Sequence, residues 1–140
     1  MKLSACMRQF FDKYLPHIKG LSHQTIKAYR DTFRLFLPFA AEHYGIKIES
    51  LRLDHLSPEL ILCFLDDLET NRKNTAKTRN QRLAALKSLA KMIRFVYPEK
   101  RQLAEKIINI PQKRTQKQLI GFLYPYEILN PTTLLKMIIA

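Results

Sequence analysis

The spacing of the apolar residues constrains the fold of this chain more than any other feature. In four segments these residues recur every three or four positions, which is the period that puts side chains on one face of an α-helix. The chain has only 3 glycines and almost no alternating apolar runs, so a sheet-based nucleotide-binding fold has no support. The sequence predicts an all-α fold whose apolar seams are Met7, Phe10, Phe11, Tyr14, Leu15 and Ile18; Ile26, Tyr29, Phe33, Phe36 and Leu37; Ile61, Leu62, Phe64, Leu65 and Leu68; and Leu83, Leu86, Ala90, Ile93 and Tyr97.

Three residues mark the starts of predicted helices. Ser22, Ser57 and Thr75 each precede an apolar seam, and the side-chain oxygen of such a residue can accept a hydrogen bond from an amide of the first helical turn. A further helix occupies the N-terminal segment, and a short one is predicted at about residues 99–108. The chain should therefore form a bundle of four to five helices.

Glycine and proline residues mark the ends of the predicted helices. Pro16 should end or bend the first helix, and Gly20 follows it as a stop. Pro38 lies inside the second seam, where its missing amide predicts a kink, and Gly45 closes that helix. The connector at 46–56 has some apolar alternation, which is compatible with an extended segment.

The domain organisation follows from length and composition. A chain of 140 residues is the size of one ordinary domain. Residues 1–110 are predicted to form a helical domain, and the polar, basic stretch Gln112–Gln118 that follows is typical of a linker. Residues 119–140 are apolar again but too few to build a core of their own.

The charge of the chain favours a polyanionic partner. The sequence has 24 Lys and Arg against 12 Asp and Glu, a formal net charge of +12, and such an excess suits nucleic acid first and an anionic membrane surface second. No stretch of about 18 consecutive apolar residues and no secretory signal pattern occurs. We therefore expect no membrane insertion and a cytoplasmic location.

Basic residues form a stripe opposite the apolar seam on the second and fourth helices. A helix that presents one cation per turn matches the phosphate spacing of duplex DNA, and polar neighbours could reach phosphates or base edges. A solvated surface is the alternative, but such a surface mixes both signs of charge, whereas 77–94 contains no acidic residue. The candidate DNA-binding residues are Ser22, His23, Thr25, Lys27, Arg30, Arg34, Lys77, Thr78, Arg79, Asn80, Gln81, Lys87, Lys91 and Arg94.

No metal or cofactor site is predicted. Cys6 and Cys63 lack metal-ligand spacing and are expected to be small buried hydrophobic residues. Asp66, Asp67 and Glu69 are close in sequence, but a hard cation would need further oxygen ligands from elsewhere, so a solvated helix end is the preferred interpretation.

Several sequence runs resemble one protein family. Gly20–Arg30, which reads GLSHQTIKAYR, resembles the second helix of the N-terminal core-binding domain of tyrosine recombinases, the phage integrase family. Residues 60–68 and 74–89 resemble that domain's third and fourth helices and contain the pattern T-x-N-x-R-L-x-A-L. Residues 110–113 are similar to the linker that follows, and 122–135 to the start of the catalytic domain.

The resemblance implies a SAM-like helical bundle with an extended C-terminal linker, whose second and fourth helices face double-stranded DNA. It also implies that 111–140 hold the linker and the start of a catalytic domain that cuts DNA with a tyrosine hydroxyl. No histidine is followed three residues later by arginine, so that family's His-x-x-Arg element is absent, and Tyr124 and Tyr126 are expected to be packing residues. We therefore expect no catalytic residue in this chain. It should be a non-enzymatic, DNA-binding part of a recombinase that cuts and rejoins DNA strands, and the recombinase protomers could assemble on DNA.

Two other functions remain open at this point. The chain could be a standalone DNA-binding regulator that occupies recombination sites, in which case 119–140 should pack on the bundle. It could instead be a helical protein-interaction module whose basic face meets acidic proteins or a membrane. The sequence also leaves open whether the chain is a truncated reading frame or an expressed fragment.

Overall fold

The computed structural model describes residues 1–114, and this part of the chain is helical, without a β-strand. The all-α prediction is confirmed. The predictions for residues 119–140, including those for Tyr124 and Tyr126, lie outside the described residues. The elements are α1 (Leu3–Gln9), the π-helix η1 (Phe10–Ile18), α2 (His23–Tyr44), the 3-10 turns η2 (Ile48–Ser50) and η3 (Leu53–His55), α3 (Pro58–Thr70), α4 (Ala76–Val96), the 3-10 turn η4 (Pro98–Lys100) and α5 (Arg101–Ile108).

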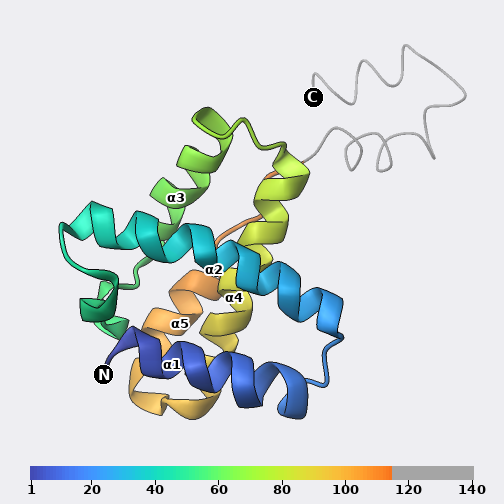
Figure 1. Ribbon diagram of the computed structural model, residues 1–140, viewed down its shortest axis with the longest axis vertical. Coiled ribbons are helices and arrows are strands. Elements are labelled where there is room, and N and C mark those ends of the chain that lie inside the picture. Colours follow the sequence, from blue (N-terminus) through green and yellow to red (C-terminus); the bar gives the residue numbers. More distant parts are fainter. Residues whose placement is uncertain (115–140) are drawn as a thin grey trace, which may run out of the picture.

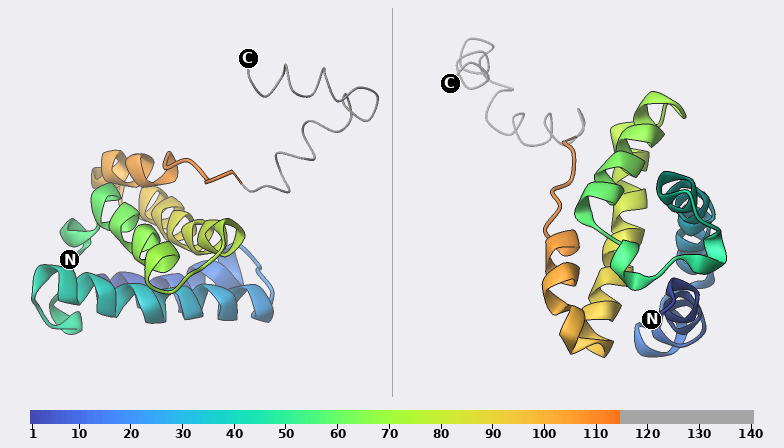
Figure 2. Two further views of the ribbon diagram at one scale, coloured as in Figure 1. Left: turned by 90° about the horizontal axis from the view of Figure 1, so that it is seen from above. Right: turned by 90° about the vertical axis from the view of Figure 1, so that its left-hand side faces the viewer.

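The helices pack as two hairpins and one added helix. The continuous run of α1 and η1 lies antiparallel to α2, and α3 lies antiparallel to α4 (Figure 1). Helix α2 crosses α4, and α5 packs on the opposite side of α4 (Figure 2). Helix α4 is therefore central, with one remaining side open to solvent.

The three predicted N-caps are confirmed. The amides of Thr25, Leu60 and Thr78 donate to the side-chain oxygens of Ser22, Ser57 and Thr75 at 3.2, 3.1 and 3.2 Å. Each bond satisfies an amide that has no partner within its own helix.

Gly45 ends α2 as predicted, in a left-handed conformation at φ 67°. Its amide donates to the carbonyls of Ala41 and Glu42 and so satisfies the last turn of the helix.

Two prolines do not end their helices. The turns around Pro16 widen to a π-helix, in which the Lys19 amide donates to the Tyr14 carbonyl five residues earlier, and the helical run continues to Ile18. Helix α2 passes through Pro38 and continues to Tyr44. The connector at 46–56 contains two 3-10 turns, so the prediction of an extended segment there is wrong. The exception is Arg52, which forms an isolated β-bridge with Lys2.

The core contains most of the predicted seams, with three corrections. Ile18 is 59% exposed, because the wider π-turns change which residues of η1 face the core. Leu62 is exposed and Leu60 is buried in its place, since α3 buries positions 60, 61, 64, 65 and 68. Cys63 is exposed as well, and only Cys6 is buried.

Candidate nucleic-acid interface

Helices α2 and α4 flank one groove, with a volume of about 500 Å³. Ala28 on α2 and Ala84 on α4 contribute short side chains to its walls, which leaves space between the two helices. The two helices that carry the basic stripes therefore border the same hollow. The groove is lined by Gln24, Thr25, Ala28, Tyr29, Asp31 and Thr32 from α2 and by Gln81, Arg82 and Ala84 from α4.

The open side of α4 is basic. This helix has six Lys and Arg residues and no acidic residue. Lys77, Lys91 and Arg94 are exposed and Lys87 is half-buried, and none of the four forms an ion pair within residues 1–114. Burial, and then the positive charge of Lys91, lowers the pKa of Lys87. The charges of Lys87 and Lys91 are thus close enough to repel each other and would gain from an anionic partner.

The cations of α2 lie beside the groove and do not line it. His23, Lys27, Arg30 and Arg34 are all exposed. Successive residues are about 100° apart around a helix axis, so Lys27 lies well away from its neighbour Ala28 on the groove wall. The α2 stripe therefore forms an outer flank of the groove.

Two of these α2 cations contact neighbouring side chains. The Arg30 guanidinium lies 5.2 Å from the centre of the Phe11 ring, within the range of a cation–π contact. Arg34 forms an exposed ion pair of 3.3 Å with Asp31, which is worth little in water. Both guanidinium groups remain accessible to a phosphate.

The candidate hydroxyl groups belong to the helix caps. Ser22 is exposed and its Oγ lies 3.0 Å from Thr25 Oγ1. In the same way, Thr78 Oγ1 accepts a hydrogen bond of 3.2 Å from Thr75 Oγ1. Both helices that border the groove, α2 and α4, thus begin with a side-chain cap. The backbone amides and the positive end of the helix dipole at such a helix start favour anions.

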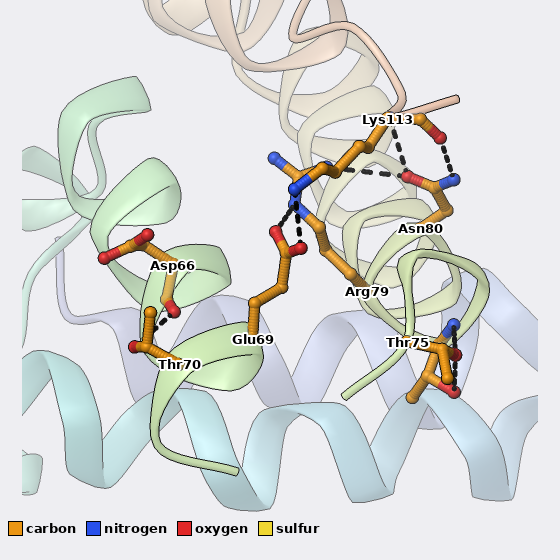
Figure 3. Close-up of polar contacts among 8 residues, drawn as sticks. Asp66, Glu69, Thr70, Thr75, Arg79, Asn80 and Lys113 are labelled. Atoms are coloured by element: carbon orange, nitrogen blue, oxygen red, sulfur yellow. Dashed lines mark hydrogen bonds and ion pairs between the residues drawn. The ribbon is translucent and has the colours of Figure 1, made fainter. Parts of the chain in front are cut away.

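Arg79 and Asn80 are not on the open side of α4. Asn80 is 8% exposed, and its carboxamide forms hydrogen bonds of 2.6 and 2.9 Å with the backbone of Lys113. Arg79 pairs with Glu69 at 2.9 Å, and its side chain is 12% exposed (Figure 3). Asn80, a candidate DNA-binding residue from the sequence, therefore does not face outward as expected, because the segment after α5 covers that position. We call Glu69, Arg79, Asn80 and Lys113 the Asn80 clamp.

A tie between α2 and α4 lies at the groove. Arg82 Nη1 donates to Thr32 Oγ1 at 3.1 Å, and the buried Thr32 hydroxyl donates to the Ala28 carbonyl at 3.3 Å. The pair fixes the crossing of the two helices at the wall of the groove.

A second groove, of about 530 Å³, lies beside the C-terminal half of α4. Four cations and no acidic residue line it, and Phe95 there is 69% exposed. Arg94 also acts on Tyr14, whose pKa is raised by burial and lowered in part by the arginine charge. The groove is lined by Tyr14, Ile18, Lys19, Lys91, Arg94, Phe95, Pro98 and Arg101.

Comparison with known proteins places this arrangement in a family. The family described as phage integrase, N-terminal SAM-like domain, matches residues 9–94. The chain belongs to this family. The match runs from the end of α1 to the last turn of α4, so it contains both helices that border the first groove.

Two relatives of this integrase SAM-like domain come from Sinorhizobium fredii. They are "Putative integrase/recombinase y4rD" and "Putative integrase/recombinase y4rC", each 33% identical to the chain over 126 residues, or 90% of its length. The chain spans 45% and 38% of the lengths of these relatives. No solved structure shows a significant match.

Several residues that line the first groove of this integrase SAM-like domain give no signal in the sequence. Gln24 and Ala28 carry no charge, and Arg82 lies on the inner side of the basic run. Lys19 and Arg101 join the second groove from separate elements, and no local pattern in the sequence signals that.

Within residues 1–114 no group of three His, Cys, Asp or Glu side chains is placed to hold a metal ion. Among the same residues no helix combines the length and the hydropathy that crossing a bilayer requires.

Proposed function

We propose that this domain binds double-stranded DNA as the N-terminal part of a site-specific tyrosine recombinase. The observation that carries the proposal is the open side of α4: three exposed cations and the half-buried Lys87, with no acidic residue on the helix, beside a groove shared with α2. Belonging to the phage integrase family supports the same function.

The arrangement suits a duplex in its spacing and chemistry. Lys77 and Lys91 lie four turns apart on one side of α4, so they can meet phosphates on both sides of a groove of the duplex. Gln81 is exposed between them and lines the first groove, where an amide could hydrogen-bond to a base edge. In the proposed complex, lysines and arginines set the affinity, and the few exposed amide and hydroxyl groups influence the choice of site.

We further propose that strand cutting belongs to a part of the recombinase outside the domain described here. The His-x-x-Arg element of the family occurs nowhere in the 140 residues. The relatives named integrase/recombinase are more than twice as long as the matched region. Assembly of several protomers on one DNA site is part of this proposal.

A titration against duplex DNA at several salt concentrations tests the proposal. Lys77→Ala with Lys91→Ala should weaken binding and reduce the slope of log affinity against log salt by about two, since each lost phosphate contact removes about one unit. Fluorescence anisotropy of a labelled duplex measures both quantities.

The matched control is Lys47→Ala with Lys106→Ala, which removes the same charge from exposed positions outside α2 and α4. Its affinity and salt slope should remain close to those of the unchanged protein. Absence of duplex binding at low salt would refute the proposal, and equal losses in both double variants would show that net charge alone attracts DNA. Tighter binding to polyglutamate than to DNA would favour the protein-interaction alternative.

A further inference from the structure

Asn80 holds the backbone of a residue far away in the sequence. Its Nδ2 donates to the Lys113 carbonyl at 2.6 Å, and the Lys113 amide donates to Asn80 Oδ1 at 2.9 Å. A carboxamide has a donor and an acceptor side by side, so it can pair with both polar groups of one residue as a neighbouring strand would. Since Asn80 is 8% exposed, water competes little for these bonds.

The side chain of Lys113 is held as well. Its Nζ lies 2.7 Å from Glu69 Oε2, while Arg79 Nε lies 2.9 Å from Glu69 Oε1 (Figure 3). One carboxylate at the end of α3 thus joins a cation from α4 to a cation from the segment after α5. Arg79 Nη1 also lies 3.5 Å from Asn80 Oδ1, so the arginine approaches the carboxamide as well as the carboxylate.

The segment is anchored at a second point, three residues earlier. Ile110 is buried, and its amide donates to the Ile107 carbonyl at the end of α5 at 3.1 Å. Pro111 follows, and its ring restricts the backbone between the two anchors. Residues 110–113 are therefore fixed at both ends against the bundle.

We infer that the corner between α3 and α4 is a binding site for an extended, lysine-bearing peptide segment, and that its occupant is the chain's own segment 110–114. Asn80 recognises the backbone and Glu69 recognises the basic side chain. The site holds residues 110–113 against α3 and α4, so the position of this segment is set relative to the helix that we propose faces DNA. The clamp itself needs no DNA, and it can be tested without any.

Hydrogen exchange and limited trypsin digestion of the full chain test the inference. In Asn80→Ala the Lys113 amide should exchange about tenfold faster, and trypsin should cleave after Lys113 about tenfold faster, because both backbone hydrogen bonds are lost. The Ile110 amide should keep its exchange rate, since Ile107 holds it independently. Gln81→Ala, at the exposed neighbouring position, is the matched control and should change neither rate.

Two further variants separate the parts of the clamp. Asn80→Asp keeps an acceptor for the Lys113 amide but loses the donor to its carbonyl, so cleavage should accelerate while amide exchange stays slower than in Asn80→Ala. Glu69→Gln should accelerate cleavage after Lys113 by a smaller factor, because the ion pair is partly exposed. Unchanged exchange and cleavage in Asn80→Asp and Glu69→Gln would overturn the inference, whether or not Asn80→Ala folds. Equal acceleration at Ile110 and Lys113 would overturn it too, because the whole end of α5 would then be opening.

Discussion

The two cysteines differ in chemistry because they differ in burial. Cys6 is fully buried, and the loss of solvation raises the pKa of its thiol to about 12. Cys63 lies on the exposed side of α3. Because only a thiolate reacts with an alkylating reagent, Cys6 should stay inert wherever the fold is intact.

Alkylation with iodoacetamide at pH 8 should therefore modify Cys63 and leave Cys6 unmodified in the folded protein. The selectivity follows from the raised pKa of Cys6, which keeps its thiol protonated, and therefore unreactive, at every pH below about 12. Mass spectrometry of tryptic peptides measures the two sites separately. Cys63→Ser should take up no label until denaturant is added, and rapid labelling of that variant without denaturant would contradict the burial of Cys6.

At the level of the element, α4 depends on its cap. Thr75 Oγ1 accepts a hydrogen bond from the Thr78 amide at 3.2 Å, and its hydroxyl donates to Thr78 Oγ1 at the same distance. The following turn contains Lys77 and no acidic residue that could replace the cap. The start of the helix therefore relies on one side-chain oxygen.

Thr75→Ala should lower the free energy of unfolding by about 1 kcal/mol, the usual cost of removing an N-cap oxygen. Thr75→Ser keeps the oxygen and should lose much less. Urea unfolding followed by circular dichroism measures both variants. Equal destabilisation by alanine and serine would mean that the threonine methyl group, and not the cap, stabilises this end of α4.

For the whole molecule, the charges of several elements act together. Lys19 follows η1, Lys91 and Arg94 belong to α4, and Arg101 begins α5, yet all four line one groove. Since no acidic residue lines that groove, the folded state concentrates positive charge that the unfolded chain spreads along its length. A polyanion that binds only the folded arrangement must stabilise the fold.

Duplex DNA should accordingly raise the melting temperature, with a stabilisation of about 2.7 kcal/mol when free DNA is one hundred times the Kd. The shift should shrink as salt rises, because screening weakens phosphate contacts. Differential scanning fluorimetry with duplex DNA and with polyglutamate of equal charge concentration provides the comparison. An equal shift with both polymers would mean that the surface binds any polyanion.

The local features of this domain follow directly from the order of its amino acids. The caps at Ser22, Ser57 and Thr75 and the stop at Gly45 were predictable because each depends on residues within about one turn. The apolar seams predicted the core of α2 and α4, since burial there follows the helical period. The excess of basic residues along α4 was equally visible without a structure.

Which polar residues are buried or hydrogen-bonded depends on how the helices of residues 1–114 pack together. Asn80 and Lys113 are 33 residues apart, and Arg82 and Thr32 are 50 apart, so no local spacing reveals that these side chains hold the bundle together. Leu62 and Ile18 are exposed because other residues of α3 and η1 are the ones that pack into the core. A period in the sequence indicates that a helix has two sides, but which side another element covers depends on how the helices pack.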